Sequence, residues 1–278
     1  MSEAGKTAYI TGGASGIGKA VVRMLVEKGI KVCIADRDEA GIKAAISELG
    51  DKGKSIMSVK VDAADWDSQV QAFDKAVTEF GRIDYVLPVA GIGERRWLKK
   101  DQTEKWTKPD LTVIDVNLTG LIYTVALAIQ QFRRQEPNDF GFRGKIMAVA
   151  SVCGFYAIPT IPVYTASKHG VAGFVRCYGK YLPEEKITIN AVCPNVVKTH
   201  ISTGVFYDRV DKLGYLTPME TLLDAFQAQM GDSQMSGELL ECGPVGKYAI
   251  RKVPEYLDEP SGILCDIVRE RSHPNITP

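Results

Sequence analysis

Three side chains within residues 149–174 have the chemistry needed to move a proton while a hydride leaves or joins a carbon atom. Tyr164 and Lys168 are four residues apart, so they share one face if this stretch is helical. Ser151 precedes Tyr164 by 13 residues and ends a strand-like apolar run. A phenol, whose ordinary pKa is about 10, is a poor base near neutral pH, but a neighbouring ammonium lowers that pKa by favouring the phenolate. The serine hydroxyl is suited to hydrogen-bond a substrate oxygen while its charge changes.

The same three residues also fit a purely structural interpretation. A tyrosine four residues before a lysine arises by chance in many helices, and serine is common at strand ends. These residues alone therefore do not decide between a catalytic and a purely structural role. A cofactor-binding motif elsewhere in the chain is needed to support the catalytic role.

A glycine-rich turn, Y-I-T-G-G-A-S-G-I-G-K-A, lies near the start of the chain between a strand pattern and a helical pattern. Such turns bind phosphate with the backbone N–H groups of a helix N-terminus. The turn is not a P-loop, because Ala20 stands where a serine or threonine would ligate Mg²⁺. It is not the common dinucleotide fingerprint either, because Val21 stands where the third glycine belongs.

Asp36 supports the dinucleotide interpretation, because it follows the next strand pattern and lies 18 residues beyond Gly18. A carboxylate near that offset accepts hydrogen bonds from the adenosine ribose hydroxyls and repels a 2′-phosphate. We therefore expect NAD as the cofactor, with NADP disfavoured. Arg37 is a complication, since a cation beside the same ribose offsets that repulsion, and a helix N-cap is the alternative role for Asp36.

Short apolar runs alternate with longer helical patterns along the chain. This alternation predicts βαβ units with right-handed crossovers. We expect an α/β fold, a single Rossmann-type doubly wound domain over residues 1–278, with about seven parallel strands flanked by helices. The expected strands are Thr7–Thr11, Lys31–Ala35, Ser55–Val61, Ile83–Ala90, Lys145–Ser151, Ile187–Cys193 and Glu238–Cys242.

Two stretches, about 93–110 and 198–226, interrupt the alternation, and each follows an expected strand. Ligands of open parallel sheets bind beyond the carboxyl ends of the strands, so we expect both stretches to shape a substrate pocket. The alternative is that they are solvated loops. The expected lining is mostly apolar and aromatic, which predicts a bulky, largely apolar substrate: Val152, Phe155, Tyr156, Ile158, Trp97, Phe206, Tyr207, Tyr215 and Met219.

Composition excludes several other classes of protein. The 34 basic and 34 acidic residues balance, which disfavours nucleic acid and anionic membranes as partners. The six cysteines form no C-x-x-C pair and read as reduced thiols, and the three histidines lack metal-ligand spacing, so we expect no metal. No signal peptide is visible, and the apolar stretch Val116–Ile129 is too short to span a bilayer. We expect a cytoplasmic protein.

Taken together, these motifs resemble the short-chain dehydrogenases/reductases. The family's T-G-x-x-x-G-x-G turn matches Thr11, Gly12, Gly16 and Gly18, which is why neither other template fits. Its Tyr-x-x-x-Lys pair and serine match the residues described above. Its upstream asparagine matches Asn117, and its adenine-contacting aspartate matches Asp62. The resemblance runs from about Thr7 to Thr199.

The resemblance implies a catalytic tetrad of Asn117, Ser151, Tyr164 and Lys168. Tyr164 would be the acid/base, Lys168 would lower its pKa and bind the nicotinamide ribose, Ser151 would position the substrate oxygen, and Asn117 would hold a proton-relaying water. Besides Tyr164 and Lys168, the implied cofactor-binding residues are Gly12, Ser15, Gly16, Ile17, Gly18, Asp36, Arg37, Asp62, Ala63, Ala90, Gly91, Pro194, Val197 and Thr199.

The sequence departs from the family pattern at two places. Where the family has N-N-A-G after the fourth strand, this chain has P-V-A-G at 88–91, so a structural hydrogen bond must be replaced. Where the family has P-G after the sixth strand, this chain has Pro194 and Asn195. Asparagine tolerates left-handed backbone geometry, which would preserve the turn.

The C-terminal part is similar to fungal proteins of the 15-hydroxyprostaglandin-dehydrogenase-like group. That similarity implies a substrate from secondary metabolism. Apolar helices expected at Leu111–Phe132 and Ile161–Leu182 correspond to helices that pair across a two-fold axis in the family, so we expect a homodimer or homotetramer. The alternative function is a dinucleotide-binding sensor or scaffold of the same fold without redox turnover.

Overall fold

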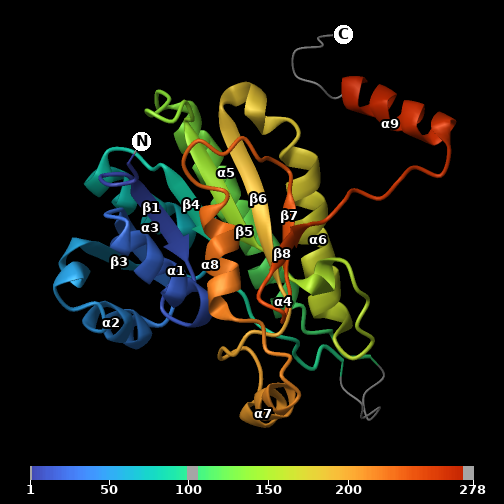
Figure 1. Ribbon diagram of the computed structural model, residues 1–278, viewed down its shortest axis with the longest axis horizontal. Helices are drawn as coiled ribbons and strands as arrows, with labels where there is room; N and C mark the ends of the chain where they lie inside the picture. Colours follow the sequence, from blue (N-terminus) through green and yellow to red (C-terminus); the bar gives the residue numbers. More distant parts are fainter. Residues whose placement is uncertain (1, 99–105, 272–278) are drawn as a thin grey trace.

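The computed structural model describes residues 2–98 and 106–271, which form a sheet with helices on both faces (Figure 1). The strand order is β3-β2-β1-β4-β5-β6-β7-β8, so the chain winds outward in both directions from β1 and confirms the doubly wound α/β prediction. The strands are β1 Thr7–Thr11, β2 Lys31–Asp36, β3 Ile56–Lys60, β4 Tyr85–Pro88, β5 Gly144–Val149, β6 Ile187–Pro194, β7 Leu239–Cys242 and β8 Tyr248–Ile250.

Strands β1–β7 all pair in parallel, which confirms the prediction of about seven parallel strands, and β8 adds an antiparallel strand that was not predicted. β7 and β8 pair antiparallel, with Cys242 opposite Tyr248. The turn between them is tight, since Gly243 N–H donates to Lys247 O at 3.1 Å and Gly246 has a φ of 72°. β8 is only three residues long and exposed, so it carries no alternating apolar pattern by which a sequence would reveal it.

Helices flank the sheet on both faces. The helices of the described residues are α1 Gly16–Glu27, α2 Glu39–Ser47, α3 Trp66–Phe80, α4 Thr112–Ile114, α5 Gly120–Arg133, α6 Pro162–Tyr178, α7 Gly204–Lys212, α8 Met219–Gln227 and α9 Glu259–Arg271, of which α7 and α9 stand away from the sheet (Figure 1). Shorter turns are the 3₁₀ segments Gly50–Ser55, Val152–Gly154 and Leu182–Glu185 and the π-helical turn Asp115–Thr119.

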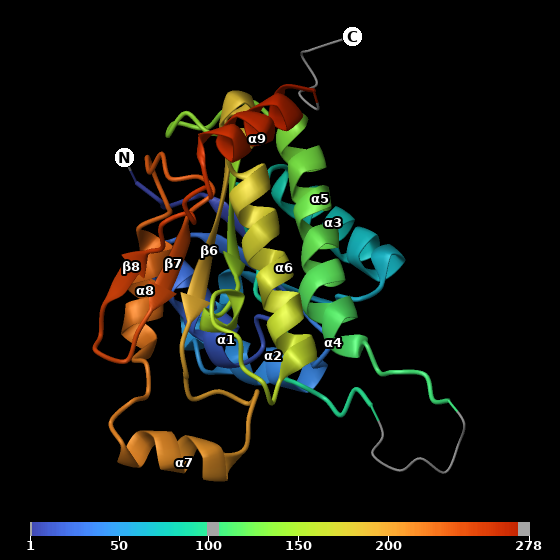
Figure 2. The same ribbon diagram turned by 90° about the vertical axis from the view of Figure 1, so that its right-hand side faces the viewer.

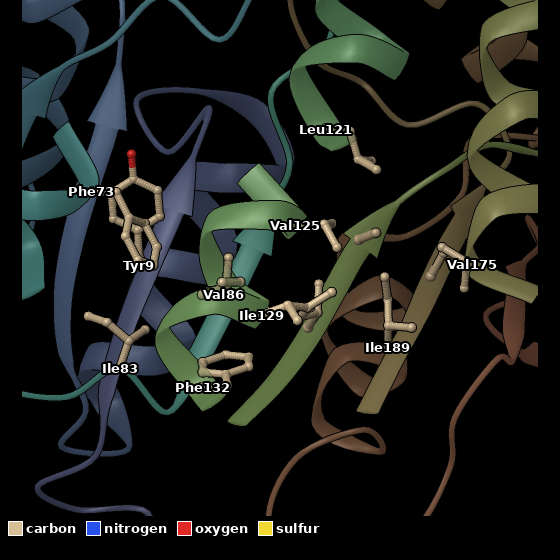
Figure 3. Close-up of a cluster of buried hydrophobic side chains, with 14 of the residues drawn as sticks. Tyr9, Phe73, Ile83, Val86, Leu121, Val125, Ile129, Phe132, Val175 and Ile189 are labelled. Carbon is tan, nitrogen blue, oxygen red and sulfur yellow. The ribbon is translucent and has the colours of Figure 1, made fainter. Parts of the chain in front are cut away.

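Successive residues of β1 show how two cores form on opposite faces of one sheet. Tyr9 packs with α3, α5 and α6 in one cluster, whereas Ala8 and Ile10 pack with α1, α2 and α8 in the other. This is the alternation of side chains expected in a strand. Figure 3 shows the first cluster. In it the rings of Tyr9 and Phe73 pack edge to face, with their centroids 4.9 Å apart. Because both faces are covered, the site must lie at an edge of the sheet.

Two predicted segments differ in detail from the structure. The expected helix Leu111–Phe132 is one apolar span, Thr112–Arg133, interrupted by the π-helical turn. The span is long and apolar enough to cross a membrane, but α5 packs on the sheet as a core helix does. The expected loop 198–226 contains α7 and α8 rather than irregular chain. Residues 99–105 of the other expected loop lie outside the described part of the structure.

Candidate active site

The candidate residues come from separate parts of the chain but meet at one edge of the sheet. The glycine turn follows β1, Asp36 ends β2, Ala90 and Gly91 follow β4, Ser151 follows β5, and Thr199 follows β6. Because these strands are parallel neighbours, their carboxyl ends lie together. This is the edge at which open α/β sheets bind their ligands.

The glycines of the turn are required by close backbone approaches. Gly12 has a φ of 75°, and a Cβ there would lie 2.6 Å from Ala90 Cα. A Cβ on Gly18 would lie 2.0 Å from Gly12 O, and one on Gly16 would lie 3.1 Å from Thr199 Cγ2. The turn therefore packs directly against two other predicted cofactor segments. Ser15 is the N-cap of α1 but makes no side-chain capping bond there.

Asp36 is fixed beside the glycine turn. Its Oδ2 accepts a hydrogen bond from Ala14 N at 3.0 Å, and its Oδ1 accepts one from Asp38 N at 3.0 Å. The N-cap of α2 is Asp38, which accepts from Gly41 N, so the capping alternative for Asp36 is wrong. Each carboxylate oxygen can accept a second hydrogen bond, so Asp36 retains capacity for ribose hydroxyls. Arg37 is exposed.

Ser151 and Tyr164 are held next to each other. Ser151 is buried and caps the following 3₁₀ turn by accepting from Cys153 N at 3.1 Å. Burial raises the pKa of Tyr164 to about 12; a hydrogen bond with Ser151 acts in the opposite direction, and the nearby Cys153 and Tyr207 raise the pKa further. The phenol is therefore protonated at neutral pH.

Lys168 lies beside Tyr164 but does not control its pKa in this arrangement. The Nζ atom is 5.7 Å from the centroid of the Tyr164 ring and donates to Val149 O at 3.0 Å. Burial lowers the pKa of Lys168 to about 8. The predicted lowering of the tyrosine pKa by the lysine is thus outweighed by the burial of the phenol itself.

Asn117 lies in the π-helical turn and is buried. Its Oδ1 accepts from Ile92 N at 2.8 Å, and its Nδ2 donates to Ile92 O at 2.9 Å and to Ser167 Oγ at 3.3 Å. The side chain therefore clamps the backbone just after Gly91 to α6. The predicted role in holding a water remains a prediction, and the side-chain amide is already engaged in this clamp.

The other implied cofactor residues have mixed surroundings. Asp62 is exposed, and its Oδ1 accepts from Ala64 N at 2.9 Å. Ala63 O comes so close to α5 that a Cβ on Gly120 would lie 2.5 Å from it. Val197 is buried in the apolar core with α8. The predicted cofactor contact of Val197 is therefore expected to use its backbone rather than its side chain.

The two departures from the family pattern are accommodated locally. Pro88 ends β4, and Val89 N supplies a hydrogen bond there to Thr11 O at 3.2 Å. Asn195 does not adopt left-handed geometry, which corrects the expectation for that turn: over the described ranges, Lys186 is the one non-glycine residue with positive φ. Instead, Asn195 N donates to Cys242 O at 3.0 Å, which ties the turn to β7.

Glu94 is a site residue that the sequence analysis missed. Its Oε2 accepts from Tyr164 N at 2.6 Å, in the first turn of α6, where Ile161 provides no side-chain cap. Its Oε1 is buried without a hydrogen-bond partner in the part of the chain that is described. The carboxylate thus caps the helix that carries the tyrosine, where a negative charge is favoured. The 70-residue separation left no local signal.

Three tyrosines of the predicted substrate lining differ in their surroundings. Tyr207 of α7 is buried, with its hydroxyl 3.1 Å from Thr199 Oγ1, and it contributes to the pKa of Tyr164. By contrast, Tyr215 is 61% exposed. Tyr156 points towards β7, where its hydroxyl donates to Glu241 Oε1 at 3.1 Å. α7 therefore reaches the candidate site through Tyr207.

Comparison with known proteins gives one consistent result. Residues 6–209 match the family model described as short chain dehydrogenase. The chain is 30% identical over 224 residues to the (S)-acetoin-forming diacetyl reductase of Staphylococcus epidermidis, covering 80% of this chain and 82% of that protein. It is 33% identical over 207 residues to human NAD(+) 15-hydroxyprostaglandin dehydrogenase, covering 72% and 71%. It superposes with a TM-score of 0.73 and 26% identity on 3-ketoacyl-(acyl-carrier-protein) reductase from Brucella melitensis complexed with NADH, covering 87% and 98%.

Proposed function

Because the chain belongs to the short-chain dehydrogenase/reductase family, we propose that it transfers a hydride between NAD(H) and a bulky, largely apolar secondary alcohol or its ketone. Members of this family are oxidoreductases that act on CH–OH groups and bind a nicotinamide dinucleotide. The observation that carries the proposal is the juxtaposition of Ser151, Tyr164 and Lys168 at the same sheet edge as the glycine turn.

The proton chemistry of the site fits reduction directly. When bound, the nicotinamide dinucleotide supplies or accepts the hydride. Tyr164, with its raised pKa, donates its proton to the carbonyl oxygen of a ketone. Ser151 hydrogen-bonds the same oxygen as negative charge develops on it. In the opposite direction the phenolate must accept the proton, and a charged Lys168 favours that form. Asn117 holds the backbone after β4 in place, whether the reaction runs as a reduction or as an oxidation.

The NAD preference is supported by the position of Asp36 beside the glycine turn. A second negative charge, such as a ribose 2′-phosphate, would be placed near a carboxylate that already has its orientation fixed. Arg37 is exposed and is the cation that would offset this repulsion. Fluorescence titration with NADH and NADPH tests the preference, and tighter binding of NADPH by the unmodified protein would show that Arg37 dominates.

The substrate class is supported by the apolar and aromatic residues near Tyr164. Val152 and Cys153 are buried beside Ser151, and Tyr207 approaches from α7. Gly204 begins α7 and Gly214 follows it with a φ of 71°, which suits a segment that closes over the substrate. The test compares kcat/KM for hydrophobic polycyclic or long-chain secondary alcohols with that for small polyols and hydroxy acids. A tenfold preference for the small polar set would refute the assignment.

The alternative is a dinucleotide-binding sensor or scaffold without turnover. Substrate-dependent production of NADH in a panel screen separates the two, because a sensor binds NADH but produces none. We also propose, on the family resemblance, a cytoplasmic homodimer or homotetramer and a role in secondary metabolism of the fungal type.

A further inference from the structure

The last helix, α9, is well formed but has an unpartnered apolar stripe. Asp258 caps it by accepting from Ser261 N at 2.9 Å, and Pro260 lies in its first turn. Its aliphatic side chains recur at helical spacing and are each more than half exposed: Ile263 52%, Leu264 63%, Ile267 53% and Val268 63%. A 13-residue helix is marginally stable in water without tertiary packing. We therefore expect the stripe to pack against another apolar surface.

The segment that leads to α9 leaves the body of the molecule beside α6. Arg176 of α6 donates to Lys252 O at 3.0 Å and, at 3.5 Å, to Arg251 O. Arg251 is also held by Glu241 at 3.2 Å. Beyond this anchor the chain is exposed, with Leu257 at 91%. We define the arm as residues 253–271.

The arm projects from the face formed by α5 and α6. Figure 2 looks onto that face, with α9 crossing in front of the far ends of both helices, and Figure 1 shows that α9 stands away from α6. The same face carries half-buried apolar side chains, which we call the α5–α6 face: Leu118, Ile122, Leu127, Phe174 and Tyr178. Gly173 on α6 is exposed, and a Cβ there would meet nothing within 4 Å.

We propose that the arm of one copy packs its aliphatic stripe on the α5–α6 face of a second copy. Any copy that docks on this face meets the projecting arm, and a helix of 13 residues, roughly 20 Å long, can lie along the exposed sides of two helices. Both surfaces are apolar and incompletely covered within one chain, so their contact removes both from water.

Charge favours a second copy over a lipid surface. Residues 253–271 contain five acidic and two basic residues, and an arm of that sign is repelled by anionic lipid. The far ends of α5 and α6 present exposed cations, Arg134 and Lys180. These two cations, which share those ends with the exposed Glu136 and Glu184, can pair with acidic residues that flank the stripe of the arm.

Sedimentation velocity over a concentration series tests whether the arm contributes to association. The test proteins are the chain ending at Lys252 and the double variant Leu264→Glu, Ile267→Glu. We expect each to raise the dissociation constant between copies at least tenfold. The control is Val245→Glu, which adds one negative charge, where the double variant adds two, at an 81% exposed apolar position outside the arm, and it is expected to change that constant less than twofold. Circular dichroism confirms that each variant is folded.

Cross-linking tests which copy receives the arm. Cys265 on α9 and Cys177 on α6 are exposed, whereas the other four cysteines are buried. A Cys177→Ser protein is mixed with a Cys265→Ser protein and treated with a short bis-maleimide. A peptide that links Cys265 to Cys177 then joins two different chains, and this is the expected product.

Three results would overturn the proposal. Unchanged association of the truncated chain would show that the arm does not hold copies together. Weakened association with the Cys177–Cys265 link formed in the unmodified chain but not in the mixture would show that the arm folds back on its own subunit, and no link at all would place the contact elsewhere. Arm-dependent co-sedimentation with phosphatidylserine vesicles, without an effect on association, would assign the stripe to a membrane surface.

Discussion

Replacing Tyr164 with phenylalanine removes one oxygen atom from the site and should separate chemistry from folding. The ring keeps its packing, and Ser151 keeps the hydrogen bond that it accepts from Cys153 N at 3.1 Å. Burying a neutral hydroxyl carries a desolvation cost, which removal of the hydroxyl relieves. Loss of its hydrogen bond with Ser151 acts against stability by about 1 kcal/mol. The two effects oppose each other, so we expect the free energy of unfolding to change by less than about 1 kcal/mol.

The effect on turnover should be far larger. A positioned acid or base contributes roughly 10²–10⁴-fold to the rate, which corresponds to about 2.7–5.4 kcal/mol of transition-state free energy. In the described site no other phenol is placed to replace Tyr164, because Ser151 is an aliphatic alcohol and the hydroxyl of Tyr207 is hydrogen-bonded to Thr199. Without the phenol, the proton must come from water.

The assay is initial-rate measurement of NADH production or consumption with the best substrate of the panel, alongside NADH binding and thermal unfolding. Tyr156→Phe is the matched control, since that hydroxyl bonds Glu241 on β7, and it should keep turnover within a few-fold. A Tyr164→Phe protein with near-normal turnover would refute the acid/base assignment. Equal losses of turnover in both variants would show that the tyrosine ring environment, rather than the proton, is what matters.

Three further predictions test other parts of the site. Asp36→Asn keeps an acceptor for Ala14 N but removes the charge, so it should narrow the NADH-over-NADPH preference at least tenfold in fluorescence titration; an unchanged preference would exclude charge as its cause. The pKa of Lys168 is lowered to about 8, so its ammonium is lost as pH rises through that value. We therefore expect kcat/KM, measured from pH 6 to 10, to fall on the alkaline side. Lys168→Arg stays charged, so this alkaline fall in kcat/KM should disappear even if the overall rate of the variant is lower. Glu94→Ala removes the acceptor that caps Tyr164 N, so it should lower the free energy of unfolding by about 1 kcal/mol and kcat several-fold. Glu94→Gln keeps an acceptor and should recover the melting temperature. An alanine variant with the melting temperature and kcat of the unmodified protein would leave Glu94 without a positioning role.

Local patterns in the sequence were sufficient to predict the fold and to collect the candidate residues at one place. The alternation of strand and helix periods fixes the order of elements, and the rule that parallel strands end at one edge brings Asp36, Ser151 and Tyr164 together although they are far apart in the chain. The glycines of the turn could also be predicted from the sequence, because their spacing in a short segment is itself a motif. β8 was missed because three exposed residues carry no period.

Contacts between distant segments could not be predicted in this way. Glu94 reaches Tyr164 N across 70 residues, and Asn117 reaches Ile92 across 25. Neither pair has a spacing that any helix or strand period would indicate. The π-helical turn that carries Asn117 has no marker in the sequence D-V-N-L-T. Such contacts depend on which loop packs against which helix end, and this packing is set by the tertiary structure rather than by local sequence.

The pKa of Tyr164 shows most clearly where local reasoning ends. A lysine four residues away predicts a more acidic phenol, but this lysine is hydrogen-bonded to Val149 O, and the hydroxyl of the half-buried Tyr164 is desolvated by its surroundings. Desolvation depends on everything that surrounds the group, so its sign could not be obtained from a spacing. In the proposed mechanism the protonated phenol donates its proton to a ketone. For the oxidative direction that an NAD preference favours, the phenol must become more acidic. The pKa of Tyr164 is therefore expected to be lower when the bound cofactor is NAD⁺, whose ring is positively charged, than when it is NADH.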